Sequence, residues 1–113
     1  MTKKYLIYAM EGEKMCFTHA LLNAKQLKAK GYEVKIIIEG AACKLIQVLE
    51  DEKNSLYLEL KEDNTIVGVC LACSKVLGVY EANVASGIPM LNDMMGHAGI
   101  APYAEDGYET LIF

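Results

Sequence analysis

Two cysteines at a three-residue spacing, Cys70 and Cys73, are the residues of this chain best suited to chemistry. They follow the short apolar run 66–69 and begin a segment compatible with a helix, so the pair should lie where a strand ends and a helix starts. The first N–H groups of a helix have no intrahelical partner and carry the positive end of its dipole, which favours a thiolate over a thiol. The pair therefore predicts nucleophilic sulfur, with Cys70 as the attacking thiolate and Cys73 as a neighbouring thiol.

Three further residues occupy comparable positions in the sequence. Cys16 and Cys43 each come shortly after a predicted strand, and His97 stands in a glycine-rich bend after another. In an open parallel sheet, sites lie at the carboxyl ends of the strands, so these side chains could share one edge with the cysteine pair. We expect Cys43 and His97 to contribute to substrate binding. The alternative for Cys16 and Cys43 is packing as small hydrophobic residues, and for His97 a role in the turn.

The cysteine spacing is compatible with more than one chemistry. A dithiol oxidoreductase would use both thiols, although the flanking residues lack the Trp-Cys-x-x-Cys-Lys context of thioredoxins. A closed zinc site needs four ligands, so this chain would have to add Cys16, Cys43 or His97 to the pair. We expect no metal, because only one C-x-x-C pair is present, and no cofactor, because neither Gly-x-Gly-x-x-Gly nor a P-loop is present. Glu11 and Glu13 fit a solvated turn better than a cation site.

The composition of the chain argues against several classes of function. A chain of 113 residues, 53% of them hydrophobic, suits a single domain over residues 1–113. Its net charge of -4, without a basic run, argues against nucleic acid or an anionic membrane as a partner. No apolar run approaches the roughly 18 residues that span a bilayer. The chain enters its first predicted strand directly, so we expect no signal peptide and a cytoplasmic protein, in which cysteines are usually reduced.

Strand and helix patterns alternate along the chain. Apolar and β-branched runs predict strands at residues 5–10, 33–39, 66–69, 88–93 and 108–113. Amphipathic or helix-forming segments predict helices at residues 15–30, 43–52, 73–85 and 102–107, and the ambiguous stretch 54–64 is assigned to a short helix. This alternation predicts an α/β fold with a parallel sheet and helices on both of its faces.

The order of these elements and the motif Gly68-Val69-Cys70-Leu71-Ala72-Cys73, with Gly78 eight residues after Cys70, resemble the DsrE/DsrF-like family. That family includes sulfur-relay subunits such as TusD and the YchN-type proteins. The resemblance covers residues 5–113 and implies a single DsrE-like domain: a three-layer α/β/α sandwich with a five-stranded parallel sheet that assembles into trimers or hexamers. In relay members, the cysteine that matches Cys70 receives a persulfide sulfur and passes it to a partner protein. Alanine matches Cys73 in those members, so the second thiol here also suits a reductase or a redox switch.

The leading hypothesis is a small cytoplasmic sulfur-carrier or thiol-redox protein, sulfurtransferase-like if it is an enzyme. Cys70 would carry the sulfur, Cys73 would modulate or resolve it, and the partners would be further copies of the chain and sulfur donor and acceptor proteins. The alternative is a homo-oligomeric module that binds a small ligand or a metal without a catalytic thiol. A flavodoxin-like electron carrier ranks last, because no phosphate-cradling loop is evident. The methionine-rich stretch 90–95 could pack inside one subunit or line a subunit contact.

Overall fold

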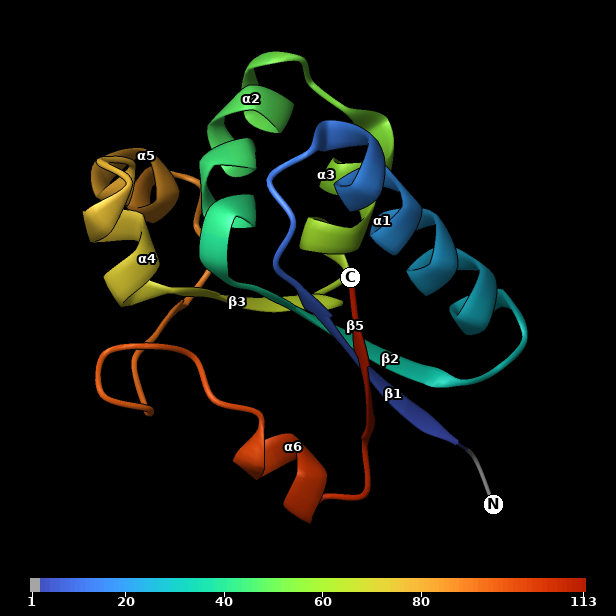
Figure 1. Ribbon diagram of the computed structural model, residues 1–113. Helices are drawn as coiled ribbons and strands as arrows, with labels where there is room; N and C mark the ends of the chain where they lie inside the picture. The colour runs from blue at the N-terminus through green and yellow to red at the C-terminus, as the bar shows by residue number, and fades with distance from the viewer. Residues whose placement is uncertain (1–2) are drawn as a thin grey trace.

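The computed structural model describes residues 3–113 and contains a five-stranded, all-parallel sheet with helices packed on it (Figure 1). The strands lie in the order β4-β3-β2-β1-β5. They are β1 (Lys4–Ala9), β2 (Glu33–Ile38), β3 (Ile66–Cys70), β4 (Met90–Leu91) and β5 (Glu109–Ile112). The predicted α/β class and the predicted five-stranded parallel sheet are confirmed.

The helices cover the two faces of the sheet unequally. They are α1 (Lys14–Ala29), the 3-10 helix η1 (Gly40–Lys44), α2 (Leu45–Asp51), α3 (Ser55–Glu62), α4 (Leu71–Val76), α5 (Tyr80–Ala85) and α6 (Ala101–Glu105). Helices α1 to α5 lie on one side of the sheet and α6 lies on the other (Figure 1). Strands β1 to β4 are added one after another toward one edge, so right-handed crossovers place their connections on the same face, whereas the return to β5 at the opposite edge uses the other face. No helix within residues 3–113 has the length and apolar character needed to cross a membrane.

Two predicted elements differ from the observed ones. The helix predicted at residues 73–85 is divided into α4 and α5, because Gly78 has a φ of +73° and ends α4 in the left-handed conformation that commonly terminates helices. The strand predicted at residues 88–93 is reduced to β4, which pairs with β3 at only two positions before the chain turns away. The helix assigned to the ambiguous stretch 54–64 is confirmed as α3.

The centre of the sheet is buried on both faces. Residues 6–9 of β1 and 36–38 of β2 are all buried, which explains why these parts of the two strands are continuously apolar rather than alternating. In β3, Gly68 makes room for the edge strand, because a Cβ at that position would lie 2.3 Å from Cγ of Leu91. The close approach of β4 to β3 brings the segment that follows β4 over the end of β3. The carboxyl ends of β2 and β3 and the segment after β4 therefore meet at one edge.

Candidate functional site

Four side chains capable of chemistry meet at the carboxyl edge of the sheet. Cys70 and Cys73 stand at the junction of β3 and α4, Glu39 follows β2, and His97 lies beyond β4. Each side chain offers one oxygen, nitrogen or sulfur atom to the cluster, and these four atoms all lie within 4.8 Å of one another. The structure thus brings together three of the residues selected from the sequence and adds Glu39; we call these four residues the thiol cluster.

Cys70 is fully buried and caps the start of α4. Its Sγ accepts a hydrogen bond from the backbone N–H of Cys73 at 3.3 Å and lies 3.2 Å from Nδ1 of His97. The helix start was expected to favour the thiolate, but burial raises the pKa of the Cys70 thiol and outweighs the opposing effect of the Cys73 N–H. Helix α4 has only six residues, so the dipole at its start is small compared with the loss of contact with water. Cys70 therefore rests as a thiol whose neighbours can assist its deprotonation.

Cys73 is less buried than Cys70 and faces the carboxylate of Glu39. Its thiol donates a hydrogen bond to Oε1 of Glu39 at 2.7 Å, and its Sγ lies 3.4 Å from Nδ1 of His97. Burial and the hydrogen bond to the Glu39 carboxylate both raise the pKa of the Cys73 thiol. Cys73 therefore holds its proton at neutral pH, and the same imidazole nitrogen lies within reach of both thiols.

Glu39 is a buried carboxylate with a complete set of hydrogen-bond donors. Oε1 accepts from the backbone N–H of Gly40 at 3.0 Å as well as from Cys73, and Oε2 accepts from the N–H of Ala98 at 3.1 Å. The hydroxyl of Tyr8 lies 3.2 Å from Oε2 and 2.7 Å from the carbonyl oxygen of Ala98, so one proton serves both acceptors. Burial alone would raise the pKa of Glu39, but hydrogen bonds from the Cys73 and Cys70 side chains and from the N–H groups of Gly40 and Ala98 lower it below its ordinary value. Glu39 is thus a negative charge at the base of the cluster.

A tight hairpin places His97 over the two thiols. Met94 and His97 exchange two backbone hydrogen bonds of 2.9 Å, and the residues between them have positive φ angles, +53° at Met95 and +91° at Gly96, as a type I′ turn requires. The carbonyl of Gly96 accepts a hydrogen bond from the N–H of Ala72 at 2.9 Å, which fixes the hairpin to the start of α4. A methionine in the left-handed conformation is strained, and such residues gather at functional sites. The His97 side chain is 44% exposed, so the cluster borders solvent on this side.

A buried polar network holds the cysteine-bearing turn against its neighbours. The hydroxyl of Ser74 donates to the carbonyl oxygen of Cys70 at 2.8 Å and accepts from Nδ2 of Asn83 at 2.9 Å. Nδ2 of Asn83 also donates to the carbonyl oxygen of Cys43 at 3.0 Å. Ser74 and Asn83 are both fully buried, so this network ties α4 to α5 and to η1. It fixes the backbone on which Cys70 and Cys73 stand.

The other two cysteines lie outside the thiol cluster. Cys43 is fully buried, its Sγ is 3.6 Å from the carbonyl oxygen of Ile38, and burial raises the pKa of its thiol to about 12. Cys16 is exposed on α1. All four cysteines are free thiols. Of the cysteines expected to share the carboxyl edge of the sheet, only Cys70 and Cys73 lie in the thiol cluster.

Sequence reasoning missed Glu39 and Tyr8. Glu39 was included only as the last residue of a predicted strand, although an acidic residue directly after the apolar run 36–38 stands where sites occur in parallel sheets. Tyr8 carried no separate signal, because a tyrosine within an apolar strand is ordinary core composition. The carboxyl-edge rule could have identified Glu39.

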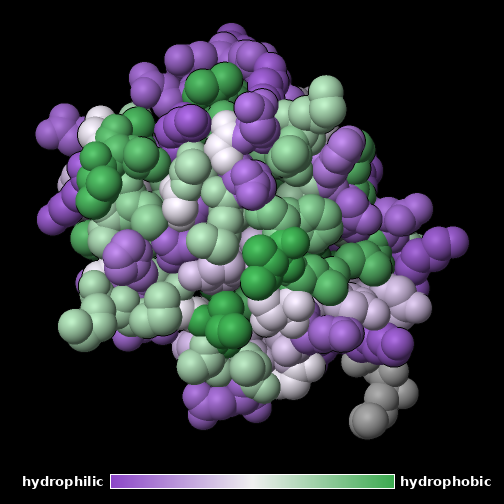
Figure 2. All heavy atoms as spheres, in the orientation of Figure 1, coloured by the Kyte–Doolittle hydropathy of each residue, from purple (hydrophilic) through white to green (hydrophobic). Residues whose placement is uncertain are grey.

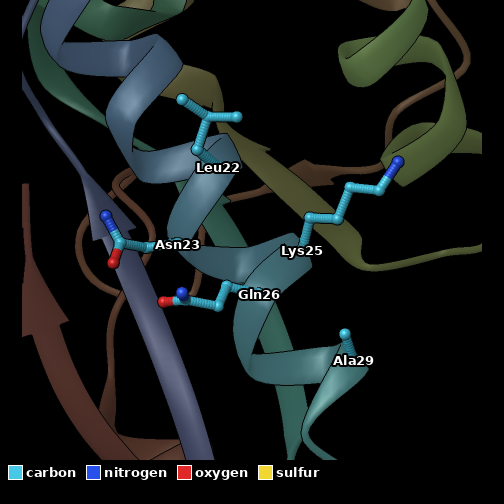
Figure 3. A pocket seen from close by; sticks show the side chains of 5 residues that line it. All are labelled: Leu22, Asn23, Lys25, Gln26 and Ala29. Atoms are coloured by element: carbon cyan, nitrogen blue, oxygen red, sulfur yellow. The ribbon is translucent and has the colours of Figure 1, made fainter.

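A surface hollow on α1 is separate from the thiol cluster. It is lined by Leu22, Asn23, Lys25, Gln26 and Ala29, all from one stretch of that helix (Figure 3). These residues offer an amine and two amides but no thiol, imidazole or carboxylate. The thiol cluster therefore remains the candidate site for chemistry.

The chain is similar to proteins of two archaea. It is 34% identical over 93 residues to uncharacterized protein MJ0733 of Methanocaldococcus jannaschii, an alignment that covers 82% of this chain and 76% of that protein. It is 45% identical over 42 residues to an uncharacterized protein of Archaeoglobus fulgidus, covering 37% of this chain and 69% of that protein. No family model matches the chain, and no solved structure does. The extent of the first alignment shows that the chain belongs to the same family as protein MJ0733 of Methanocaldococcus jannaschii.

Proposed function

We propose that the protein is a sulfur-carrier or thiol-redox protein in which Cys70 bears the sulfur and Cys73 is the neighbouring thiol. The observation that supports this most strongly is the 3.2 Å distance between Sγ of Cys70 and Nδ1 of His97. A thiol beside an imidazole is the usual arrangement for activating a cysteine nucleophile. The resemblance of the motif 68–73 to the DsrE/DsrF-like family, which includes sulfur-relay proteins, favours sulfur as the group transferred.

The first step is sulfur uptake by Cys70. Nδ1 of His97, in the tautomer that carries its proton on Nε2, accepts the thiol proton, and the N–H of Cys73 stabilises the thiolate that forms. The thiolate attacks the outer sulfur of a donor persulfide, and the sulfur–sulfur bond of the donor breaks. The donor leaves as a thiolate and takes the proton from His97. Cys70 then carries a persulfide. Its Sγ is oxidised as the inner sulfur of the donor is reduced to a thiol, so the exchange needs no external oxidant.

Two reactions can remove the sulfur from Cys70. A thiolate of an acceptor protein can attack the outer sulfur, which returns Cys70 to its thiolate and completes a transfer. Alternatively, the thiolate of Cys73 can attack Sγ of Cys70, which releases hydrosulfide and leaves a disulfide that an external thiol reductant must reduce. Because Glu39 holds the proton on Cys73, the second reaction is restrained and the carrier reaction is favoured.

Partners would approach the cluster beside His97. The adjoining Met94 and Met95 are 48% and 97% exposed, and methionine side chains adapt well to irregular partner surfaces. Hydrophobic side chains also gather in the middle of the face drawn in Figure 2, around the edge strand β5, where Ile112 is 72% exposed. We propose that such surfaces serve a homo-oligomer, a trimer or hexamer as the family resemblance implies, and the sulfur donor and acceptor proteins.

The test of this function is sulfur uptake by the reduced, metal-free protein. After incubation with a persulfide donor, intact mass spectrometry should find one added sulfur atom per chain, removable by a small thiol. A chain that gains no sulfur from any persulfide donor would contradict the proposal.

Replacing Cys73 with alanine should lengthen the lifetime of the persulfide on Cys70 by about tenfold or more, because an intramolecular thiol reacts at a high effective concentration. The loss of hydrosulfide is measured over time after the donor has been removed. Cys16→Ala is the matched control, since it also removes one thiol but lies outside the cluster. An unchanged lifetime would show that Cys73 does not act as the resolving thiol.

Replacing Glu39 with glutamine should increase the alkylation rate of Cys73 near pH 7 by about tenfold, the effect of lowering its pKa by roughly one unit. The Glu39 carboxylate raises the Cys73 pKa, so an uncharged side chain of the same shape should lower it and enlarge the thiolate fraction. Iodoacetamide labelling followed by peptide mass spectrometry measures the rate. Glu13→Gln at an exposed position is the control, and a slower or equal rate in Glu39→Gln would contradict this role of the carboxylate.

A further inference from the structure

We propose that the thiol cluster also binds a thiophilic divalent cation, of which Zn²⁺ is the best match, through Cys70, Cys73, His97 and Glu39. This goes beyond sulfur transfer and does not depend on it. The three side-chain types in the cluster, cysteine, histidine and glutamate, are the protein ligands that zinc uses. Two sulfur donors select against Mg²⁺ and Ca²⁺, which prefer oxygen ligands alone.

The three distances from Nδ1 of His97 to the other ligand atoms are close to those of a tetrahedral site, and all four ligand atoms lie within 4.8 Å of one another. Zinc bonds of about 2.3 Å to sulfur and about 2.0–2.1 Å to nitrogen or oxygen place neighbouring ligand atoms about 3.3–3.8 Å apart. Nδ1 of His97 lies 3.2 Å from Sγ of Cys70, 3.4 Å from Sγ of Cys73 and 3.5 Å from Oε1 of Glu39. The shorter distance of 2.7 Å between Cys73 and Glu39 is that of a hydrogen bond, and it would lengthen when a cation replaces the shared proton.

Hydrogen bonds from Ala98 and Tyr8 already orient the carboxylate of Glu39 for this role. Oε2 of Glu39 is occupied by the N–H of Ala98 and the hydroxyl of Tyr8, so Oε1 is the oxygen turned toward the sulfurs and the imidazole. His97 is held by its hairpin with Nδ1 toward the cluster, and its side chain is partly exposed. Hydrogen bonds that hold the ligand side chains in place raise metal affinity, because the ligands then need little rearrangement. The exposed side of His97 offers a route of entry from solvent.

Charge and proton balance favour a divalent cation. Cation binding would form bonds to two thiolates and release their two protons to solvent, without any redox change. With the Glu39 carboxylate and a neutral His97, the ligand set carries three negative charges, of which a divalent cation neutralises two. Because both sulfurs would be bound to the metal, the loaded protein could not accept sulfur at Cys70.

The test begins with reduced, metal-free protein titrated with Zn²⁺ against a chromophoric chelator. One equivalent should bind, and Co²⁺ should give the absorption bands of tetrahedral thiolate coordination. Cys70→Ser, Cys73→Ser and His97→Ala should each weaken Zn²⁺ binding by at least about tenfold. The matched controls Cys16→Ser and His19→Ala remove the same groups at exposed positions and should leave the affinity unchanged.

A second measurement needs no cluster variant and so does not depend on variant folding. Zn²⁺ should protect Cys70 and Cys73 of the wild-type chain from alkylation while Cys16 reacts as before, and a chelator should reverse the protection. Less than stoichiometric binding, or binding that Cys16→Ser abolishes, would overturn the metal site. If the metal-free protein accepts sulfur but does not bind Zn²⁺, the metal site is wrong and the proposed function stands. If it binds Zn²⁺ at the cluster but accepts no sulfur, the metal site stands and the proposed function is wrong.

Discussion

Replacing Cys70 with serine is expected to slow sulfur uptake from a persulfide donor by at least about a hundredfold, because a serine hydroxyl cannot supply the thiolate that attacks a persulfide. The fold should survive, since serine nearly matches cysteine in volume and its oxygen can accept the hydrogen bond that the N–H of Cys73 donates to Sγ. The rate is measured by intact mass spectrometry of the reduced, metal-free proteins at equal donor concentration.

The controls for this variant separate chemistry from folding. Cys16→Ser removes an exposed thiol outside the cluster and should take up sulfur at the wild-type rate. The circular dichroism spectrum of Cys70→Ser should match that of the wild type. A folded Cys70→Ser chain that takes up sulfur at the wild-type rate would place the sulfur on another thiol. An unfolded Cys70→Ser chain would show that the buried Cys70 side chain is required for folding.

Replacing Phe17 with alanine should lower the free energy of unfolding by about 3–5 kcal/mol, a large part of the 5–15 kcal/mol that holds a typical domain together. Phe17 is 1% exposed on the side of α1 that packs into the core, so its loss removes apolar burial and leaves a cavity. Urea unfolding followed by circular dichroism measures the difference.

The same helix provides the comparison for Phe17. Leu22 is 50% exposed on α1, and Leu22→Ala should cost less than about 1 kcal/mol because little apolar surface is removed from the interior. Equal losses of stability in Phe17→Ala and Leu22→Ala would contradict the observed packing of α1 on the sheet.

The fold class could be predicted because local patterns determine it. Strand β1 is a nearly continuous apolar run and β2 is rich in β-branched residues, and α1 has mixed apolar and charged residues up to Gly31, so their types follow from composition and period. The order of the strands could not be predicted, because alternation fixes the handedness of the connections but not which strands become neighbours. The placement of β5 beside β1 results from tertiary packing. The break at Gly78 was visible as a glycine, but its consequence depends on the positive φ found there.

The site was only partly predictable, because some of its residues are brought together by contacts between distant parts of the chain. The three-residue spacing of Cys70 and Cys73 identifies the thiols directly. Glu39 joins the site through its hydrogen bond to Cys73, 34 residues away in sequence, and is held there by Tyr8 and Ala98, which are 31 and 59 residues away. The direction of the Cys70 pKa shift was predicted wrongly, because the dipole of a helix start can be inferred from sequence whereas the burial of the thiol cannot.

The most direct test of the central claim is to locate the transferred sulfur in the wild-type chain. The reduced, metal-free protein is incubated with a persulfide donor, its thiols and persulfides are trapped by alkylation, and its peptides are fragmented in the mass spectrometer. We predict a mass increase of one sulfur atom at Cys70, with Cys16 and Cys43 unchanged. Sulfur found at Cys16 or Cys43 instead of Cys70 would contradict the account.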